Sequence, residues 1–153
     1  MVKRGYPELV VGLYILNAQD KLLLVKAPKW GEQWMIPGGH VELGESVFET
    51  SKREAMEEVG LEIEPLGVLV MAEDIFPTTF HEPERHFFYL ETICRAKTES
   101  VKMDNAEIRQ TGWFGLEEAL LLVKEPVLMR TIKSYIEQKK NGKISYINIG
   151  KHG

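Results

Sequence analysis

Three glutamates, Glu54, Glu57 and Glu58, are spaced so that a single helix would bring their carboxylates together. They occupy positions i, i+3 and i+4, and at about 100° per residue they fall within an arc of roughly 100°. Like charges at this spacing repel, and each pair costs a helix roughly a few tenths of a kcal/mol. A cation that shares the site would offset the repulsion, and ligands that supply only oxygen favour Mg²⁺ or Mn²⁺ over zinc. The spacing therefore predicts a metal site, and with it a candidate catalytic site.

The residues around these glutamates predict the helix that must position them. Ser46 and Glu49 form an S-x-x-E capping box, and Gly60 stands where a glycine commonly ends a helix. On a helical wheel, small and apolar residues make a continuous arc beside the acidic one: Val47, Phe48, Ser51, Ala55 and Val59. One face of this helix should therefore pack on a sheet, while the neighbouring edge presents carboxylates to a cleft.

The segment from Gly39 to Leu61 resembles the Nudix box, G-x5-E-x7-R-E-U-x-E-E-x-G-U, in which U is a bulky aliphatic residue. The matching residues are Gly39, Glu45, Arg53, Glu54, Glu57, Glu58, Gly60 and Leu61. The one departure is Ala55 at the first U position. Because Ala55 lies on the expected core face, a smaller residue there should change the packing depth without altering the acidic face.

The resemblance implies a fold, an activity and a set of site residues. The family fold is an α/β/α sandwich around a mixed β-sheet with a loop–helix–loop catalytic motif. Its members (MutT-related pyrophosphatases among them) cleave nucleoside diphosphates linked to another moiety, with a divalent metal. Carried over by position, the metal ligands would be the carboxylates of Glu54, Glu57 and Glu58, with the Gly38 carbonyl as a further ligand. Arg53 would brace this group, and Glu45 could reach Arg53 or a metal-bound water.

The general base that accepts a proton from the attacking water stays open at this point. Glu54 is the first candidate, and the catalytic set is taken as Glu54, Glu57, Arg53 and Glu45. The alternatives are Glu107, Glu82 and Glu84. Glu107 is of interest because it lies in the polar segment just before Trp113, where relatives often carry an extra acid.

Composition places the chain among ordinary globular proteins and restricts its partners. It has 153 residues, 44% of them hydrophobic, and a formal net charge of −4. We expect one domain over residues 1–153, located in the cytoplasm as a monomer or a small oligomer. Relatives are often homodimers, so the oligomeric state stays open at this point. The acidic balance disfavours binding to a DNA or RNA duplex, although a bound metal would still permit a small nucleotide substrate. Cys94 is the single cysteine, is expected in the core, and excludes an intrachain disulfide.

The remaining elements follow from apolar runs and from Pro and Gly punctuation. Residues 36–39 are expected to form a tight, irregular backbone that can approach a ligand closely. The segment 87–96 alternates in polarity and is interpreted as a strand buried on one face. His81 and His86 could contact phosphate or act as an acid, but they are interpreted as polar surface residues. The aromatic residues of the loops are interpreted as core, interface or base-stacking residues: Trp30, Trp34, Phe76 and Phe80. The other predictions are strands over 9–16, 22–25, 66–72 and 144–149, a short strand at 113–114, a loop over 73–86, and helices over 116–123 and 127–140 separated by Pro126.

The sequence thus favours Mg²⁺-dependent hydrolysis of a nucleoside triphosphate or a nucleotide sugar. An alternative is a non-catalytic nucleotide sensor or interaction module on the same fold, although such proteins usually carry an eroded box. Decapping or another reaction at an RNA end is less expected from an acidic chain without a basic extension. The leaving group should be chosen by loops such as 28–34 and 73–86.

Overall fold

The computed structural model describes residues 5–75, 84–103 and 106–147. Seven strands form one mixed sheet in the order β3-β2-β1-β6-β5, with β4 also paired to β1 and β7 to β2. The β1–β6 pair is parallel, and the other pairs are antiparallel. The elements are β1 (Glu8–Leu16), β2 (Leu22–Lys26), a short 3₁₀ turn (Pro28–Trp30), β3 (Trp34–Met35), β4 (Gly38–His40), α1 (Val47–Val59), β5 (Ile63–Ile75), β6 (His86–Ala96), β7 (Gln110–Phe114), α2 (Leu116–Leu122) and α3 (Pro126–Lys140).

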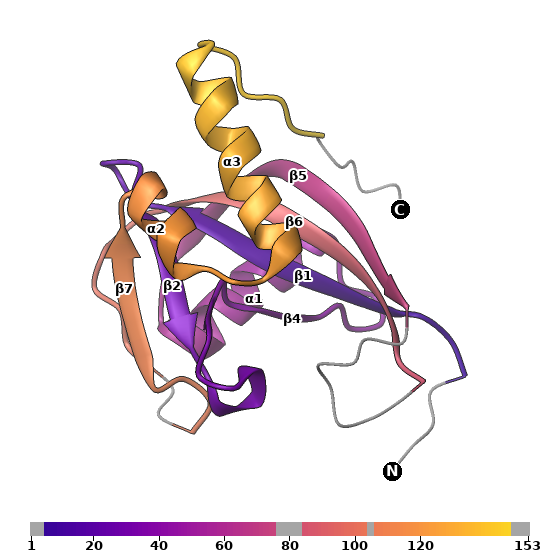
Figure 1. The fold of residues 1–153 in the computed structure, drawn as a ribbon. Coiled ribbons are helices and arrows are strands. Elements are labelled where there is room, and N and C mark those ends of the chain that lie inside the picture. Colours follow the sequence, from indigo (N-terminus) through magenta and orange to yellow (C-terminus); the bar gives the residue numbers. More distant parts are fainter. Residues whose placement is uncertain (1–4, 76–83, 104–105, 148–153) are drawn as a thin grey trace.

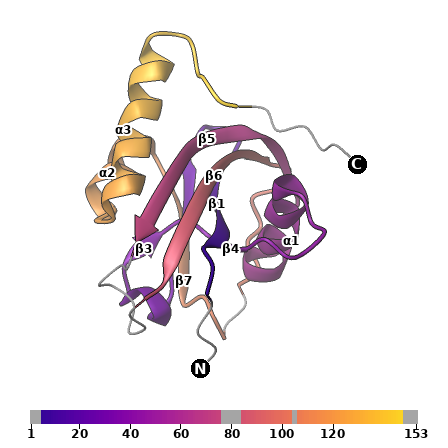
Figure 2. The ribbon, with the colours of Figure 1, turned by 90° about the vertical axis from the view of Figure 1, so that its right-hand side faces the viewer.

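Helices cover both faces of the sheet. Figure 2 shows α1 on one side and α2 with α3 on the other. Successive residues of β1 feed the two cores, because Leu13 packs in the cluster that holds Ala55 of α1, whereas Tyr14 packs in the cluster that holds Ile132 of α3. A strand buried on both faces needs apolar residues at nearly every position, which explains the continuous apolar run of β1. This α/β/α arrangement confirms the expected fold class.

The expectation that 87–96 is a half-buried strand is wrong in its central part. Residues Glu91, Thr92, Ile93 and Cys94 are all buried, since β6 lies between β1 and β5 and is covered from both sides. Cys94 lies in the α1-side core as predicted. The carboxyl group of Glu91, which the polarity pattern had placed towards solvent, is therefore enclosed beneath α3.

Several predicted boundaries shift. The strand expected over 66–72 extends over Ile63–Ile75, with register shifts opposite β6. The two expected helices are present as α2 and α3, but Pro126 is the first residue of α3 and does not lie between them; its missing N–H is harmless there. Of the strand expected over 144–149, the described part forms a single bridge between Ile147 and Val68. Residues 76–83, within the loop expected over 73–86, lie outside the described residues.

The glycines before the acidic helix form a strand and not the irregular backbone expected for them. Gly38 and Gly39 pair with Gly12 and Val11 in β4, and neither has a positive φ. They are needed for space: a Cβ on Gly38 would collide with the Val11 carbonyl, and one on Gly39 would collide with the Glu54 carboxylate. The two glycines therefore allow β1, β4 and α1 to approach closely (Figure 1). The Glu54 carboxylate of α1 then lies against β4.

Among the described residues, no helix is both long and apolar enough to cross a membrane.

Candidate active site

The ends of α1 are formed as its sequence predicts. The Ser46 hydroxyl accepts from the Glu49 N–H at 3.2 Å, and the Glu49 carboxylate accepts from the Ser46 N–H at 2.7 Å. Gly60 ends the helix with φ 63°. Both caps act within a few residues, so they define where the helix begins and ends without help from the rest of the fold.

Arg53 organises the carboxylates. Its Nε and Nη2 atoms donate to the two oxygens of Glu45 at 2.8 and 3.0 Å. Its Nη1 donates to Glu54 at 2.7 Å and to Glu57 at 3.1 Å, and Nη2 also donates to the His40 carbonyl at 3.0 Å. The side chain thus makes the bracing contact expected with Glu57, and Glu45 reaches Arg53.

These contacts shift the pKa values of both Glu45 and Arg53. The Arg53 hydrogen bonds lower the pKa of Glu45 to about 2, against the opposing effect of desolvation. In turn, the hydrogen bond with Glu45 raises the pKa of the Arg53 guanidinium. Charge-assisted, two-pronged pairs of this kind are both strong and directional. Glu45 therefore holds the fork of Arg53 in one orientation, and Arg53 in turn orients Glu54 and Glu57.

The three clustered glutamates are not equivalent. Their side chains are 5% exposed for Glu58, 12% for Glu54 and 59% for Glu57. Burial raises the pKa of Glu58 to about 7, although the nearby Lys29 charge and a hydrogen bond from the Gly38 N–H at 3.2 Å oppose the shift. Two of the three carboxylates are thus enclosed between α1 and β4, and the third faces solvent at the rim.

A cleft of about 580 Å³ opens over these groups. It brings together Glu54, Glu57, Glu58, Arg53 and Gly38 of the sequence-based site. Glu45 does not line it and acts through Arg53. The lining residues are Lys29, Gly38, Gly39, His40, Glu42, Arg53, Glu54, Glu57, Glu58 and Glu107.

The structure separates the alternative general bases. Glu107, on the segment before β7, lines the cleft and lies 4.0 Å from the Lys29 ammonium. Glu84 is not among the lining residues. Glu82 lies outside the described residues. Glu107 is therefore the alternative to Glu54 that the fold brings to the cleft.

Three lining residues were missed by sequence reasoning: Lys29, His40 and Glu42. Lys29, in the turn between β2 and β3, places its ammonium 3.7 Å from Glu58. His40 follows Gly39 directly and lies with Nε2 2.8 Å from the buried carboxylate of Glu8. Arg85 donates two hydrogen bonds of 2.6 and 2.8 Å to the same carboxylate. The pairing with Arg85, and to a smaller extent that with His40, lowers the pKa of Glu8 to about 2. In the sequence, only the place of Lys29 within the loop 28–34 and of His40 directly after Gly39 pointed to the site.

The aromatic and histidine candidates of the loops have structural partners where they are described. Trp30 packs against the α1-side core, and Trp34 meets Phe114 edge-on with ring centroids 5.0 Å apart. His86 pairs with Glu73 at 2.7 Å. Phe76, Phe80 and His81 lie outside the described residues.

The donor chemistry of the cleft fits a hard divalent cation. It offers three carboxylate side chains, of which Glu54 and Glu58 are nearly enclosed, and Gly39, whose missing Cβ lets the Glu54 carboxylate lie against β4. Within 5–75, 84–103 and 106–147, however, no three acidic, His or Cys side chains converge as they stand to hold an ion. The reason is visible in the contacts: Arg53 binds Glu54 and Glu57, and Lys29 faces Glu58. Convergence on a metal would require rotation of these side chains.

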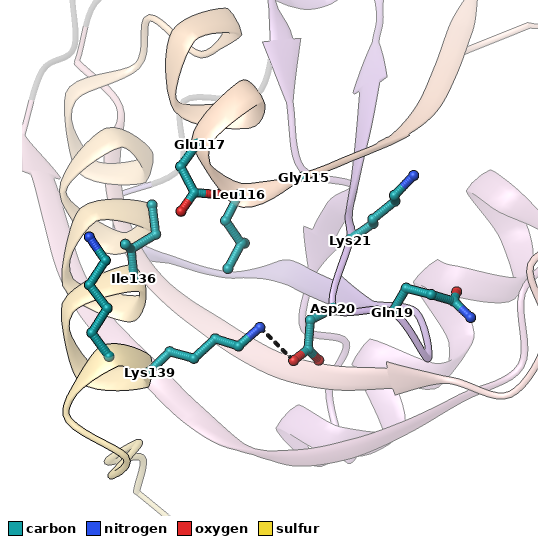
Figure 3. A pocket seen from close by; sticks show the side chains of 9 residues that line it. Gln19, Asp20, Lys21, Gly115, Leu116, Glu117, Ile136 and Lys139 are labelled. Atoms are coloured by element: carbon teal, nitrogen blue, oxygen red, sulfur yellow. Dashed lines mark ion pairs between the residues drawn. The ribbon is translucent and has the colours of Figure 1, made fainter.

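A second cleft, of about 430 Å³, lies across the sheet between the β1–β2 turn, the start of α2 and the C-terminal half of α3 (Figure 3). Its central carboxylate, Asp20, is paired with Lys139 at 2.8 Å and with Arg95 at 2.7 Å. The Asp20 side chain is 29% exposed and Glu117 is also exposed, so neither carboxylate of this cleft is enclosed as Glu58 is in the first.

Comparison with known proteins agrees with the geometry. The family model described as NUDIX domain matches residues 7–135. The chain is 28% identical over 127 residues to the m7GpppN-mRNA hydrolase NUDT17 of Xenopus laevis, covering 74% of this chain and 43% of that protein. It is 29% identical over 124 residues to the asymmetrical bis(5'-nucleosyl)-tetraphosphatase of Mus musculus, covering 76% and 79%. The chain thus spans less than half the length of the Xenopus protein.

Solved structures share the fold. A NUDIX hydrolase from Nitrosomonas europaea superposes with a TM-score of 0.76 at 20% identity, over 94% of this chain and 77% of that one. A MutT protein from Methanosarcina mazei Go1 superposes with a TM-score of 0.71 at 21% identity, over 90% and 99%.

Proposed function

Because this chain belongs to the Nudix family, we propose that it hydrolyses the diphosphate linkage of a nucleoside diphosphate joined to another moiety, with a divalent metal ion. The observation that carries the proposal is the group of three carboxylates at one cleft, Glu54, Glu57 and Glu58, the first two of which are braced by Arg53. Oxygen-only donors favour Mg²⁺ or Mn²⁺.

The residues that would hold the metal are Glu54, Glu57 and Glu58, with the Gly38 carbonyl. When bound, the ion neutralises diphosphate oxygens and lowers the pKa of a coordinated water. The residues around the cleft orient the carboxylates. Arg53 holds Glu54 and Glu57, and Glu45 holds Arg53 from outside the cleft. The Gly38 N–H orients Glu58 from β4.

We favour Glu54 as the base that accepts the proton of the attacking water. Arg53 donates to its Oε1, so Oε2 is not engaged by that guanidinium. Glu107 is the alternative, with a side chain 57% exposed at the cleft. Comparison of E54Q and E107Q distinguishes them: loss of the base should lower kcat roughly 100-fold or more, and activity should return as the pH rises and hydroxide replaces the base. A kcat within a few-fold of wild type for E54Q would exclude Glu54.

The favoured substrates are nucleoside triphosphates and nucleotide sugars. The two relatives described above are named for cleaving an mRNA cap and dinucleoside tetraphosphates, which are also phosphoric anhydrides. The test is incubation of the purified protein with Mg²⁺ and nucleoside triphosphates, nucleotide sugars, dinucleoside polyphosphates, ADP-ribose or capped RNA. Chromatography and mass spectrometry identify the products.

Variants tie any activity to the cleft. We expect E57Q and E58Q to abolish turnover with the fold retained, whereas E117Q, at the second cleft, should behave as wild type. If E57Q and E58Q both keep wild-type Mg²⁺-dependent activity, the ligand set is wrong. If no substrate of the panel is cleaved, the nucleotide-sensor alternative is favoured, and nucleotide binding without turnover would support it.

A further inference from the structure

Two cations lie against the acidic group, and they are held in different ways. Arg53 makes five hydrogen bonds of 2.7 to 3.1 Å to four residues. Lys29 approaches Glu58 at 3.7 Å and Glu107 at 4.0 Å, both longer than an N–H···O hydrogen bond. Arg53 is therefore a fixed part of the site, whereas charge alone holds the Lys29 ammonium near the carboxylates.

The surroundings of Lys29 allow it to leave. Its side chain is 48% exposed, and its ammonium also lies over the ring of the adjacent Trp30, 4.6 Å from the centroid. A cation over an indole face is stabilised there as well. Movement away from Glu58 would therefore break no hydrogen bond of Lys29 to the residues that the structure describes, and it would leave the ammonium in contact with solvent and the ring.

Glu58, by contrast, needs a cation nearby. Its carboxylate is almost enclosed, and an unpaired charge in such a place is unfavourable. Among the described residues, Lys29 is the cationic side chain within ion-pair distance of Glu58. A metal ion bound by Glu58 would repel the ammonium from the same oxygens, so one cation must replace the other.

We propose that Lys29 is an exchangeable counter-ion: its ammonium neutralises Glu58 in the metal-free protein and is displaced when a divalent cation binds the cleft. The inference rests on the proposed function in so far as it requires metal binding at this cleft. Lys29 takes no part in the reaction itself. It lowers the affinity of the cleft for the metal because the incoming ion must displace its ammonium from Glu58.

The experiment is a calorimetric titration of the full chain with Mn²⁺ in the absence of substrate. Wild type is compared with K29Q, K29R and K139Q, after circular dichroism confirms that each is folded. Lys139 is a matched control, because it is 45% exposed and paired with a carboxylate in the second cleft (Figure 3). We expect K29Q to bind Mn²⁺ about threefold or more tightly, K29R to resemble wild type, and K139Q to be unchanged.

The outcomes separate this inference from the function itself. An unchanged or weaker Mn²⁺ affinity in K29Q overturns the exchange, and so does equal tightening in K139Q, which would reflect net charge alone. If wild type binds Mn²⁺ and cleaves substrate while K29Q matches it, only the exchange is wrong. If wild type binds no Mn²⁺, the proposed metal-dependent function is wrong, and the exchange with it.

Discussion

Arg53 connects more of the site than any glutamate does. Through one planar group it joins Glu45, before α1, to Glu54 and Glu57 on the helix and to the His40 carbonyl on β4. A lysine at this position would keep the charge and lose the fork, so it could not satisfy these acceptors together. The consequence is measurable in both activity and stability.

We expect R53K to lower kcat about 100-fold and the free energy of unfolding by about 2 kcal/mol, because several charge-assisted hydrogen bonds are lost. Steady-state kinetics and urea denaturation measure the two effects. R95K is the control, since Arg95 pairs with Asp20 at the second cleft. An R53K protein as active as wild type would show that the charge alone is sufficient.

Glu91 is a second residue whose environment decides its behaviour. Its Oε2 atom and the Tyr14 hydroxyl are buried without a hydrogen-bond partner among the described residues. Burial raises the pKa of Glu91 to about 7, opposed by a hydrogen bond with Thr131 of α3 and reinforced by the Glu125 charge. The carboxyl group is therefore protonated in the folded protein under conditions where the unfolded chain would ionise it.

This shift predicts a pH-dependent loss of stability. Because the folded pKa of Glu91 lies above the unfolded value near 4.5, the contribution of Glu91 to the free energy of unfolding is fully present below pH 4.5. This contribution is lost as the pH rises through 7, by on the order of 3 kcal/mol. E91Q should not show this pH-dependent loss. The difference in the free energy of unfolding between E91Q and wild type, measured by urea denaturation, should therefore shift in favour of E91Q between pH 4.5 and 7. E64Q, at an exposed position of β5, is the control. Parallel pH profiles for E91Q and wild type would contradict the assignment.

At the scale of elements, the site depends on how closely α1 approaches β4. Gly39 lies directly beneath the Glu54 carboxylate, and no side chain fits between them. The family box places a glycine there, but the structure shows the reason for it. Strand and helix come from adjacent segments, so the contact forms as soon as both elements pack on β1.

A methyl group at Gly39 should therefore disable the site more than the fold. We expect G39A to lower kcat by about 100-fold or more through displacement of Glu54, with a stability loss of about 1–3 kcal/mol from overpacking. Kinetics and thermal melting measure these. G115A is the matched control, because a Cβ at Gly115 meets nothing within 4 Å and its φ is −56°. Wild-type kinetics in G39A would show that Glu54 can move without loss.

At the scale of the whole molecule, metal binding should be linked to folding. The three carboxylates are brought together only in the folded chain, where they repel and two of them are enclosed. An ion that binds the native state alone stabilises it by mass action. A homodimer, a cytoplasmic location and a single domain over 1–153 stay predictions from the sequence.

At Mn²⁺ about 100-fold above its dissociation constant, the native state gains about 2.7 kcal/mol, which should raise Tm by roughly 5–10 °C for a chain of this size. Scanning calorimetry with Mn²⁺ or with EDTA measures the difference. E58Q should show a much smaller rise. Identical melting of wild type with and without Mn²⁺ would contradict metal binding at the cleft.

The sequence by itself determined the parts of this protein that depend on neighbours along the chain. The capping box, the Gly60 terminus and the i, i+3, i+4 spacing of the glutamates all act within a turn or two of helix, and each was found as predicted. The apolar runs indicated buried strands, whereas the sandwich was implied by the resemblance to the Nudix family. The polarity of β6 was misleading because alternation does not report what covers the second face.

Only the tertiary structure decided which groups meet across the sheet. It enclosed Glu54 and Glu58 but left Glu57 at the rim, and it brought Lys29 to Glu58. The pairing of Glu8 with Arg85 spans 77 positions of sequence. Such contacts depend on strand order and on the approach of α1 to β4. The helical period defines the acidic face, whereas the packing of distant strands sets its burial and its counter-ions.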